Sequence, residues 1–196
     1  MIIYYATKNN GKVLSLRRDL AECEVEIIQV PLDMPEPRSS DVQKIALEKI
    51  SYAFRHLQKP VVVLDAGFYV HSLNGFPRAY VNFVLETIGI EGILTLAAGK
   101  NRECEFRQCL AFRDDSLEES LCFQSSIRGT LATQSRGQVQ AHHWSPLSLI
   151  FLPEGQSKTL AEMSHAEYDQ WHWPGRKNSA AKQFAKYLEG RRRKKK

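Results

Sequence analysis

The sequence predicts an α/β fold, because strand patterns and helix patterns alternate along the whole chain. Neither an internal repeat nor a long linker interrupts this alternation. We therefore expect a single domain over residues 1–190, followed by a basic, disordered tail over residues 191–196. The β-rich runs lie at 2–6, 24–30, 60–70, 103–113, 119–127 and 148–153. The helical patterns begin after residue 12 and after residue 41, and two more cover 79–98 and 179–188.

Turn-forming residues mark the ends of the first elements. The first strand, IIYYA, ends in the polar turn TKNNGK before a helix that starts near Val13. The loop PLDMPEPRSS is rich in proline, and Ser40 or Asp41 caps the helix that follows it. The run PVVVLDAGFYV is typical of a strand buried in a sheet, and we expect it to break at residues 65–67.

The basic character of the chain is concentrated at one end. The formal net charge is +5, and the six basic residues 191–196 account for more than this, so the rest of the chain is nearly neutral. Such an end either makes weak, salt-sensitive contacts with nucleic acid or is simply solvated.

Composition also narrows the class of protein. The chain has no run of 18 apolar residues and no cationic leader, so we expect a cytoplasmic protein that does not enter a membrane. Its four cysteines show no CxxC pair, which favours reduced packing residues over a disulfide framework or a zinc site.

Four segments, in order along the chain, resemble the inosine triphosphate pyrophosphatase family. They are ATKNNGK at 6–12, the stretch 60–94 that contains LDAGF, RGTL at 128–131, and IFLPEGQSKTLAEMS at 150–164. The resemblance implies an elongated α/β domain with a mixed twisted sheet, two lobes flanking a central cleft, and assembly as a homodimer. It also implies Mg²⁺-dependent hydrolysis of non-standard purine nucleoside triphosphates (ITP, XTP, dITP) to monophosphate and pyrophosphate.

The resemblance carries specific roles onto this sequence. Asp65 is the expected catalytic carboxylate and metal ligand, and Lys12 the expected catalytic and phosphate-binding cation. The remaining substrate-binding residues that it implies are Thr7, Asn9, Phe68 and Arg176. Each assignment has a plainer alternative. Thr7, Asn9 and Lys12 also suit an ordinary turn that caps a helix, and Asp65 could cap a turn at residues 66–67.

Several positions depart from the family pattern. Leu64 stands where the family has the first acid of its pair, and Lys44 where it has a glutamate in the second helix. Ser148 replaces an acid, and Tyr168 replaces a lysine. Nearby carboxylates that could compensate are Glu36, Asp41 and Glu48, and the helix pattern favours none of them. The replacements leave open a catalytically impaired relative that binds a nucleotide without metal, or one that serves as an interaction protein.

Histidine and tryptophan gather in two segments of the second half of the chain. These residues are His142, His143, Trp144, His165, Trp171, His172 and Trp173. Three interpretations remain open: aromatic packing with exposed histidines, a surface that stacks on a planar ligand, or a transition-metal site built from imidazoles.

Overall fold

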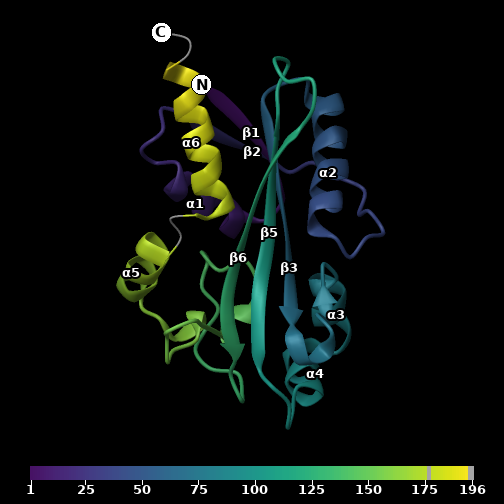
Figure 1. Cartoon of the computed structure of the whole chain (residues 1–196), viewed down its shortest axis with the longest axis vertical. Coiled ribbons are helices and arrows are strands. Elements are labelled where there is room, and N and C mark those ends of the chain that lie inside the picture. Colours follow the sequence, from purple (N-terminus) through teal and green to yellow (C-terminus); the bar gives the residue numbers. More distant parts are fainter. Residues whose placement is uncertain (176–177, 194–196) are drawn as a thin grey trace. The chain divides into compact units, whose positions relative to one another are not determined.

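A computed structural model describes residues 1–175 and 178–193, without the side chains of residues 172–175. Within this part of the chain, seven strands form one mixed sheet in the order β2-β1-β3-β5-β6-β7, with β4 paired to β3 (Figure 1). The strands are β1 (Ile2–Ala6), β2 (Glu26–Val30), β3 (Val61–Val70), β4 (Pro77–Arg78), β5 (Glu103–Arg113), β6 (Leu121–Leu131) and β7 (Phe151–Pro153). The α-helices are α1 (Asn10–Asp19), α2 (Val42–Leu57), α3 (Val81–Thr87), α4 (Gly89–Leu96), α5 (His165–Gly175) and α6 (Ala180–Arg193). The predicted α/β class with a mixed sheet is confirmed.

The chain divides into two compact units. Unit 1 contains residues 1–65, 108–125 and 178–196, and unit 2 contains residues 66–107 and 126–177. Strands β3, β5 and β6 contribute residues to both units. None of the described helices is long and apolar enough to cross a membrane.

Unit 1 is built on parallel strand pairing. β1 pairs in parallel with β2 and with β3, and Tyr5 lies opposite Val62. Parallel strands are usually covered on both faces, which explains why the first half of β3 is fully buried. α2 begins at Asp41, whose carboxylate accepts the backbone N–H of Gln43 at 2.8 Å, as the predicted cap requires.

β3 does not break at residues 65–67 as the sequence suggested. It continues to Val70, and its second half pairs with β4 so that Phe68 lies opposite Arg78. Gly67 permits this pairing, because a Cβ at that position would lie 2.7 Å from the carbonyl oxygen of Arg78. The glycine that suggested a turn therefore allows two backbones to approach closely.

The end of the chain also differs from expectation. α6 continues through Arg193, so the first three residues of the basic run are helical rather than disordered. Arg191 Nη1 lies 2.5 Å from Asp114 Oδ2, and Arg192 pairs with Glu24 at 2.6 Å. Part of the positive charge is therefore neutralised within unit 1.

Candidate functional site

The turn between β1 and α1 is held by its own side chains. Thr7 Oγ1 accepts the backbone N–H of Asn9 at 3.1 Å, and Asn9 Oδ1 accepts the backbone N–H of Lys12 at 3.0 Å. Asn9 is thus the N-cap of α1. Both side-chain oxygens belong to the local turn, whereas Asn10 Oδ1 accepts from Gln29 on β2 and Lys12 reaches across to β3.

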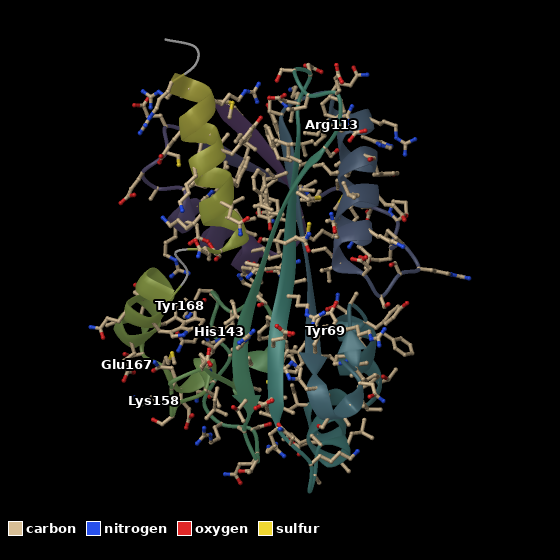
Figure 2. All side chains as sticks on the ribbon, viewed as in Figure 1. Tyr69, Arg113, His143, Lys158, Glu167 and Tyr168 are labelled. Carbon is tan, nitrogen blue, oxygen red and sulfur yellow. The ribbon has the colours of Figure 1, made fainter. Side chains whose placement is uncertain are left out.

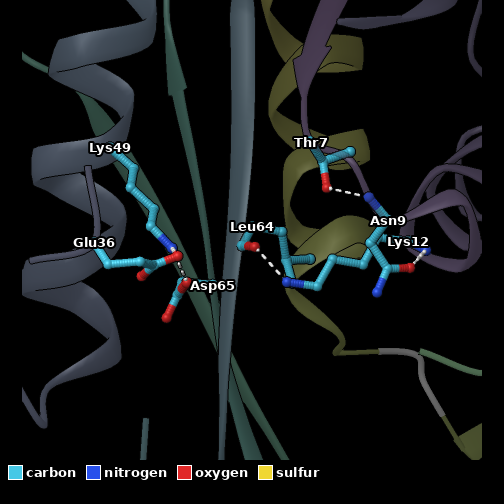
Figure 3. Close-up of polar contacts among 7 residues, drawn as sticks. All are labelled: Thr7, Asn9, Lys12, Glu36, Lys49, Leu64 and Asp65. Carbon is cyan, nitrogen blue, oxygen red and sulfur yellow. Dashed lines mark hydrogen bonds and ion pairs between the residues drawn. The ribbon is translucent and has the colours of Figure 1, made fainter. Parts of the chain in front are cut away.

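Lys12 reaches from α1 to β3. Its Nζ donates to the carbonyl oxygen of Leu64 at 2.9 Å (Figure 3). Burial lowers the pKa of Lys12, and the negative charge of Asp65 only partly offsets this. Among the described residues, the ammonium makes this one hydrogen bond, although a lysine carries three donors. A group of this kind can neutralise a phosphate oxygen.

Asp65, the next residue along β3, binds a lysine from the opposite side. Lys49 Nζ on α2 lies 2.9 Å from Asp65 Oδ1 and 2.9 Å from Glu36 Oε1. The Lys49 and Asp65 side chains are only 11% and 12% exposed, whereas that of Glu36 is 76% exposed. Burial alone would lower the pKa of Lys49, but the charges and hydrogen bonds of Asp65 and Glu36 outweigh it and raise the pKa.

Figure 3 shows the two lysines on either side of β3. Lys12, with Asn9 and Thr7, lies on one side, and Lys49, with Glu36 and Asp65, lies on the other. The candidate site in unit 1 therefore combines two ammonium groups, of Lys12 and Lys49, with two carboxylates, of Glu36 and Asp65. Such a set can neutralise phosphate charge and can also offer oxygen ligands to a cation.

Glu36 was named from the sequence only as one of three possible carboxylates, and Lys49 was not identified as the residue that links it to Asp65. The side chain of Lys44, which we expected to disturb this site, is solvent-exposed, and the ammonium that contacts Asp65 belongs to Lys49. The helical period predicts that Lys49 lies on the buried face of α2, because the buried residues Ile45 and Ala46 precede it by four and three residues. Glu36 lies in an irregular loop, where no period indicates which residues face inward.

The predicted site positions in unit 2 include two buried side chains. Phe68 is 0% exposed and packs against Phe106 and Phe151, with ring centroids 4.8 and 6.2 Å away. We expected this ring to contact substrate, and the structure places it in the hydrophobic core of the unit. Ser148 is also buried, and within the described part of the chain its Oγ has no hydrogen-bond partner. Arg176 lies outside the described residues.

The histidine-rich segment packs as an aromatic cluster. The ring of Tyr168 lies 4.6 Å from that of His142, 6.0 Å from that of His143 and 5.6 Å from that of Trp171, between ring centroids. Figure 2 shows Tyr168 and His143 in this part of the molecule. His143 Nδ1 accepts the backbone N–H of Gln140 at 3.0 Å. Burial, and then the charge of His142, lower the pKa of His143 to about 4, so its ring is neutral at pH 7.

Metal binding by the histidines finds no support in the geometry. Among the described residues, no three histidine, cysteine, aspartate or glutamate side chains stand close enough together to hold a metal ion. Of the three interpretations left open by the sequence, aromatic packing is the one that the ring contacts match. Tyr168, which we expected to mark a lost phosphate contact, is buried at the centre of this cluster.

Comparison with known proteins places these features in a family. The Ham1 family matches residues 3–187 of the chain. The dITP/XTP pyrophosphatase of Methanopyrus kandleri is 36% identical over 168 residues, which cover 85% of this chain and 87% of that protein. The enzyme of the same name from Thermococcus kodakarensis is 32% identical over 190 residues, which cover 96% and 98%.

Solved structures agree on the fold. The Ham1 protein of Staphylococcus aureus superimposes with a TM-score of 0.78 at 24% identity, over 97% of this chain and 100% of that one. The HAM1 protein of Coxiella burnetii gives the same TM-score at 20% identity, over 97% and 99%. The family inferred from the four sequence segments is thereby confirmed, and the chain belongs to the Ham1 family.

Proposed function

We propose that this chain hydrolyses non-standard purine nucleoside triphosphates, with dITP, XTP and ITP as substrates, to a monophosphate and pyrophosphate. The relatives that match nearly its whole length are named dITP/XTP pyrophosphatases. The observation in this chain that carries the proposal is the convergence of Glu36 and Asp65 on one point. Each carboxylate has an oxygen 2.9 Å from Lys49 Nζ, although the two residues lie far apart in the sequence.

The residues fit a divalent cation. Mg²⁺ in phosphate-transfer sites is usually held by one or two carboxylates and the phosphates of the substrate, without a closed protein cage. Glu36 and Asp65 supply two carboxylates, and the exposed side chain of Glu36 is free to adjust. Mg²⁺ bound there would contribute positive charge next to the phosphate oxygens. The loss of an acid at Leu64 is therefore compatible with metal binding.

The protein groups have separate roles in this proposal. Lys12 donates to a phosphate oxygen and offsets its negative charge, while the turn of Thr7 and Asn9 fixes the start of α1. Asp65 orients the attacking water and accepts its proton as the oxygen attacks the α-phosphorus. The bond from that phosphorus to the bridging oxygen breaks, and pyrophosphate leaves. Arg176 is proposed to contact the base or a phosphate.

A pyrophosphate-release assay tests the proposal. We would compare dITP, XTP and ITP with dATP and dGTP, each in Mg²⁺ and in EDTA. We expect turnover of the first three, dependent on Mg²⁺. Glu36→Gln should raise the Mg²⁺ concentration needed for half-maximal rate, whereas Glu48→Gln, an exposed position on α2, should not. Equal Mg²⁺ dependence in both variants would overturn the role of Glu36.

One observation favours a second function. Lys49 occupies the position between the two carboxylates, where a cation would otherwise be held. If Lys49 stays there, the chain is a nucleotide-binding relative in which Lys12 and Lys49 supply the countercharge. Absence of pyrophosphate release, with dITP still bound in EDTA, would select this function over the first.

We also propose that the protein works in the cytoplasm as a homodimer. The family resemblance supports dimerisation, and sedimentation at several concentrations tests it. The basic end is proposed to contact nucleic acid only weakly, since Arg191 and Arg192 are engaged by Asp114 and Glu24.

A further inference from the structure

Two of the cysteines form a pair of neighbouring thiols in unit 1. Cys109 lies on β5 and Cys122 on β6, and these strands are neighbours in the sheet. Both are free thiols, and their side chains are close enough to perturb each other. Cys109 is 0% exposed, whereas Cys122 is partly exposed. Cys122 is therefore the less buried member of the pair.

Side-chain alternation places both thiols on one face of the sheet. The rings of Phe112 and Phe123 pack against Phe184 of α6, at centroid distances of 5.0 and 5.5 Å. Cys109 is three residues from Phe112, and Cys122 is one residue from Phe123. Because successive side chains point to opposite faces, both cysteines lie on the face away from α6.

α2 covers this second face. Arg113 is adjacent to Phe112 and so points to the same side as the thiols, and its guanidinium lies 5.3 Å from the ring centroid of Phe54 on α2. Lys49 of the same helix reaches Asp65 on the adjoining strand β3. The thiol pair therefore shares a sheet face with the carboxylate of the candidate site.

The two thiols differ in reactivity. The interaction with the Cys109 side chain lowers the pKa of Cys122, against the opposing effect of burial. The same interaction, followed by burial, raises the pKa of Cys109. Burial also raises the pKa of Cys23 and of Cys104. Because the thiolate is the nucleophile, Cys122 is suited to attack first and Cys109 to react second.

We propose that Cys109 and Cys122 are a redox modification site that forms a reversible disulfide with low-molecular-weight disulfides. Cys122 Sγ attacks one sulfur of the small disulfide, which forms a mixed disulfide and releases one thiol. Cys109 Sγ then attacks Cys122 Sγ, which closes the bond between β5 and β6 and releases the second thiol. The two cysteine protons end on the two released thiols, so the cysteines are oxidised and the small disulfide is reduced.

Mass spectrometry of the folded protein tests this proposal independently of its enzymatic activity. The protein is treated with oxidised glutathione, its remaining thiols are alkylated, and its peptides are analysed before and after dithiothreitol. We expect a cross-link between Cys109 and Cys122 that dithiothreitol removes. Cys109→Ser should stop at a glutathione adduct on Cys122, and Cys23→Ser should leave the cross-link unchanged.

Two results would overturn the proposal. One is a lasting glutathione adduct on Cys122 of the natural protein without the cross-link. The other is a cross-link that appears only in urea, which would place the reaction in the unfolded chain. Both results come from the natural protein, so they remain decisive even where a serine variant folds poorly.

Discussion

Lys49 Nζ lies 2.9 Å from Asp65 Oδ1, and the same ammonium lies 2.9 Å from Glu36 Oε1. One positive charge thus holds together two carboxylates that would otherwise repel each other. On the other side of β3, Lys12 binds the carbonyl oxygen of the preceding residue, Leu64, at 2.9 Å. The ammonium groups of Lys12 and Lys49 therefore contact two consecutive residues of β3. A divalent ion bound by Glu36 and Asp65 would have to compete with Lys49.

Removal of Lys49 should make the folded protein respond to Mg²⁺. In Lys49→Met, Asp65 and Glu36 lose their shared partner, so we expect the free energy of unfolding to fall by about 2 kcal/mol without metal. Added Mg²⁺ should restore much of this stability, because binding to the folded state stabilises it. Thermal denaturation across a Mg²⁺ titration measures the effect.

Lys44→Met is the matched control, since Lys44 lies on the same helix and is exposed. It should behave like the natural protein at every Mg²⁺ concentration. If Lys49→Met responds to Mg²⁺ no more than this control, then Glu36 and Asp65 do not form a cation site.

His143 should make the protein sensitive to mild acid. Its pKa is lowered from 6.5 to about 4, so between these values the unfolded chain binds a proton that the folded chain does not. Stability therefore falls as the pH drops through this window, by on the order of 1 kcal/mol after allowance for solvent screening of a partly exposed ring. His143→Asn retains an acceptor for the Gln140 N–H and should lose less stability between pH 7 and pH 4.5. Urea denaturation at both values measures this, and equal losses in the two proteins would count against the prediction.

Arg191 should stabilise the fold through Asp114. Burial would raise the pKa of Asp114, but hydrogen bonds from Arg191 and Ser116 lower it below 3.8. Its contribution is thus present above that value and is lost as the pH falls through the lower, folded-state pKa. We expect Arg191→Met to cost about 1–3 kcal/mol at pH 7, measured by urea denaturation.

The neighbouring Arg192 is the control for this effect. It pairs with Glu24, and the two side chains are 51% and 72% exposed. Ion pairs of this exposed kind contribute roughly 0–1 kcal/mol, so Arg192→Met should be nearly neutral. Equal losses in both variants would show that Arg191 acts through general charge rather than through Asp114.

The elements that the sequence predicted well are those with a clear period. The hairpin strand at 103–113 has the predicted bounds, and Asp41 caps α2 as expected. α5 was missed, because HAEYDQWHWPG has no apolar period and its aromatic residues also suit strands or loops. The break expected at residues 65–67 was wrong because Gly67 serves the pairing with β4.

The candidate site was harder to predict than the fold. Asp65 and Lys12 could be identified because each belongs to a family motif, Asp65 within the buried run of β3 and Lys12 after β1. The contact that brings Glu36 to Lys49 beside Asp65 depends on how an irregular loop folds against α2, and neither spacing nor propensity specifies that. Lys44 was expected at the site because it aligns with the family's glutamate, but its side chain is exposed and Lys49 is the residue that contacts Asp65.

Pyrophosphate release by Asp65→Asn tests whether Asp65 is the catalytic carboxylate. The assay uses dITP and XTP in Mg²⁺, with Asp33→Asn as the control, because the Asp33 side chain is 91% exposed and pairs only with exposed Lys8 among the contacts described here. We predict that Asp65→Asn lowers kcat by about 10²- to 10³-fold, while Asp33→Asn retains the natural rate. A rate for Asp65→Asn equal to that of the control, in protein shown by circular dichroism to be folded, would contradict the assignment of Asp65.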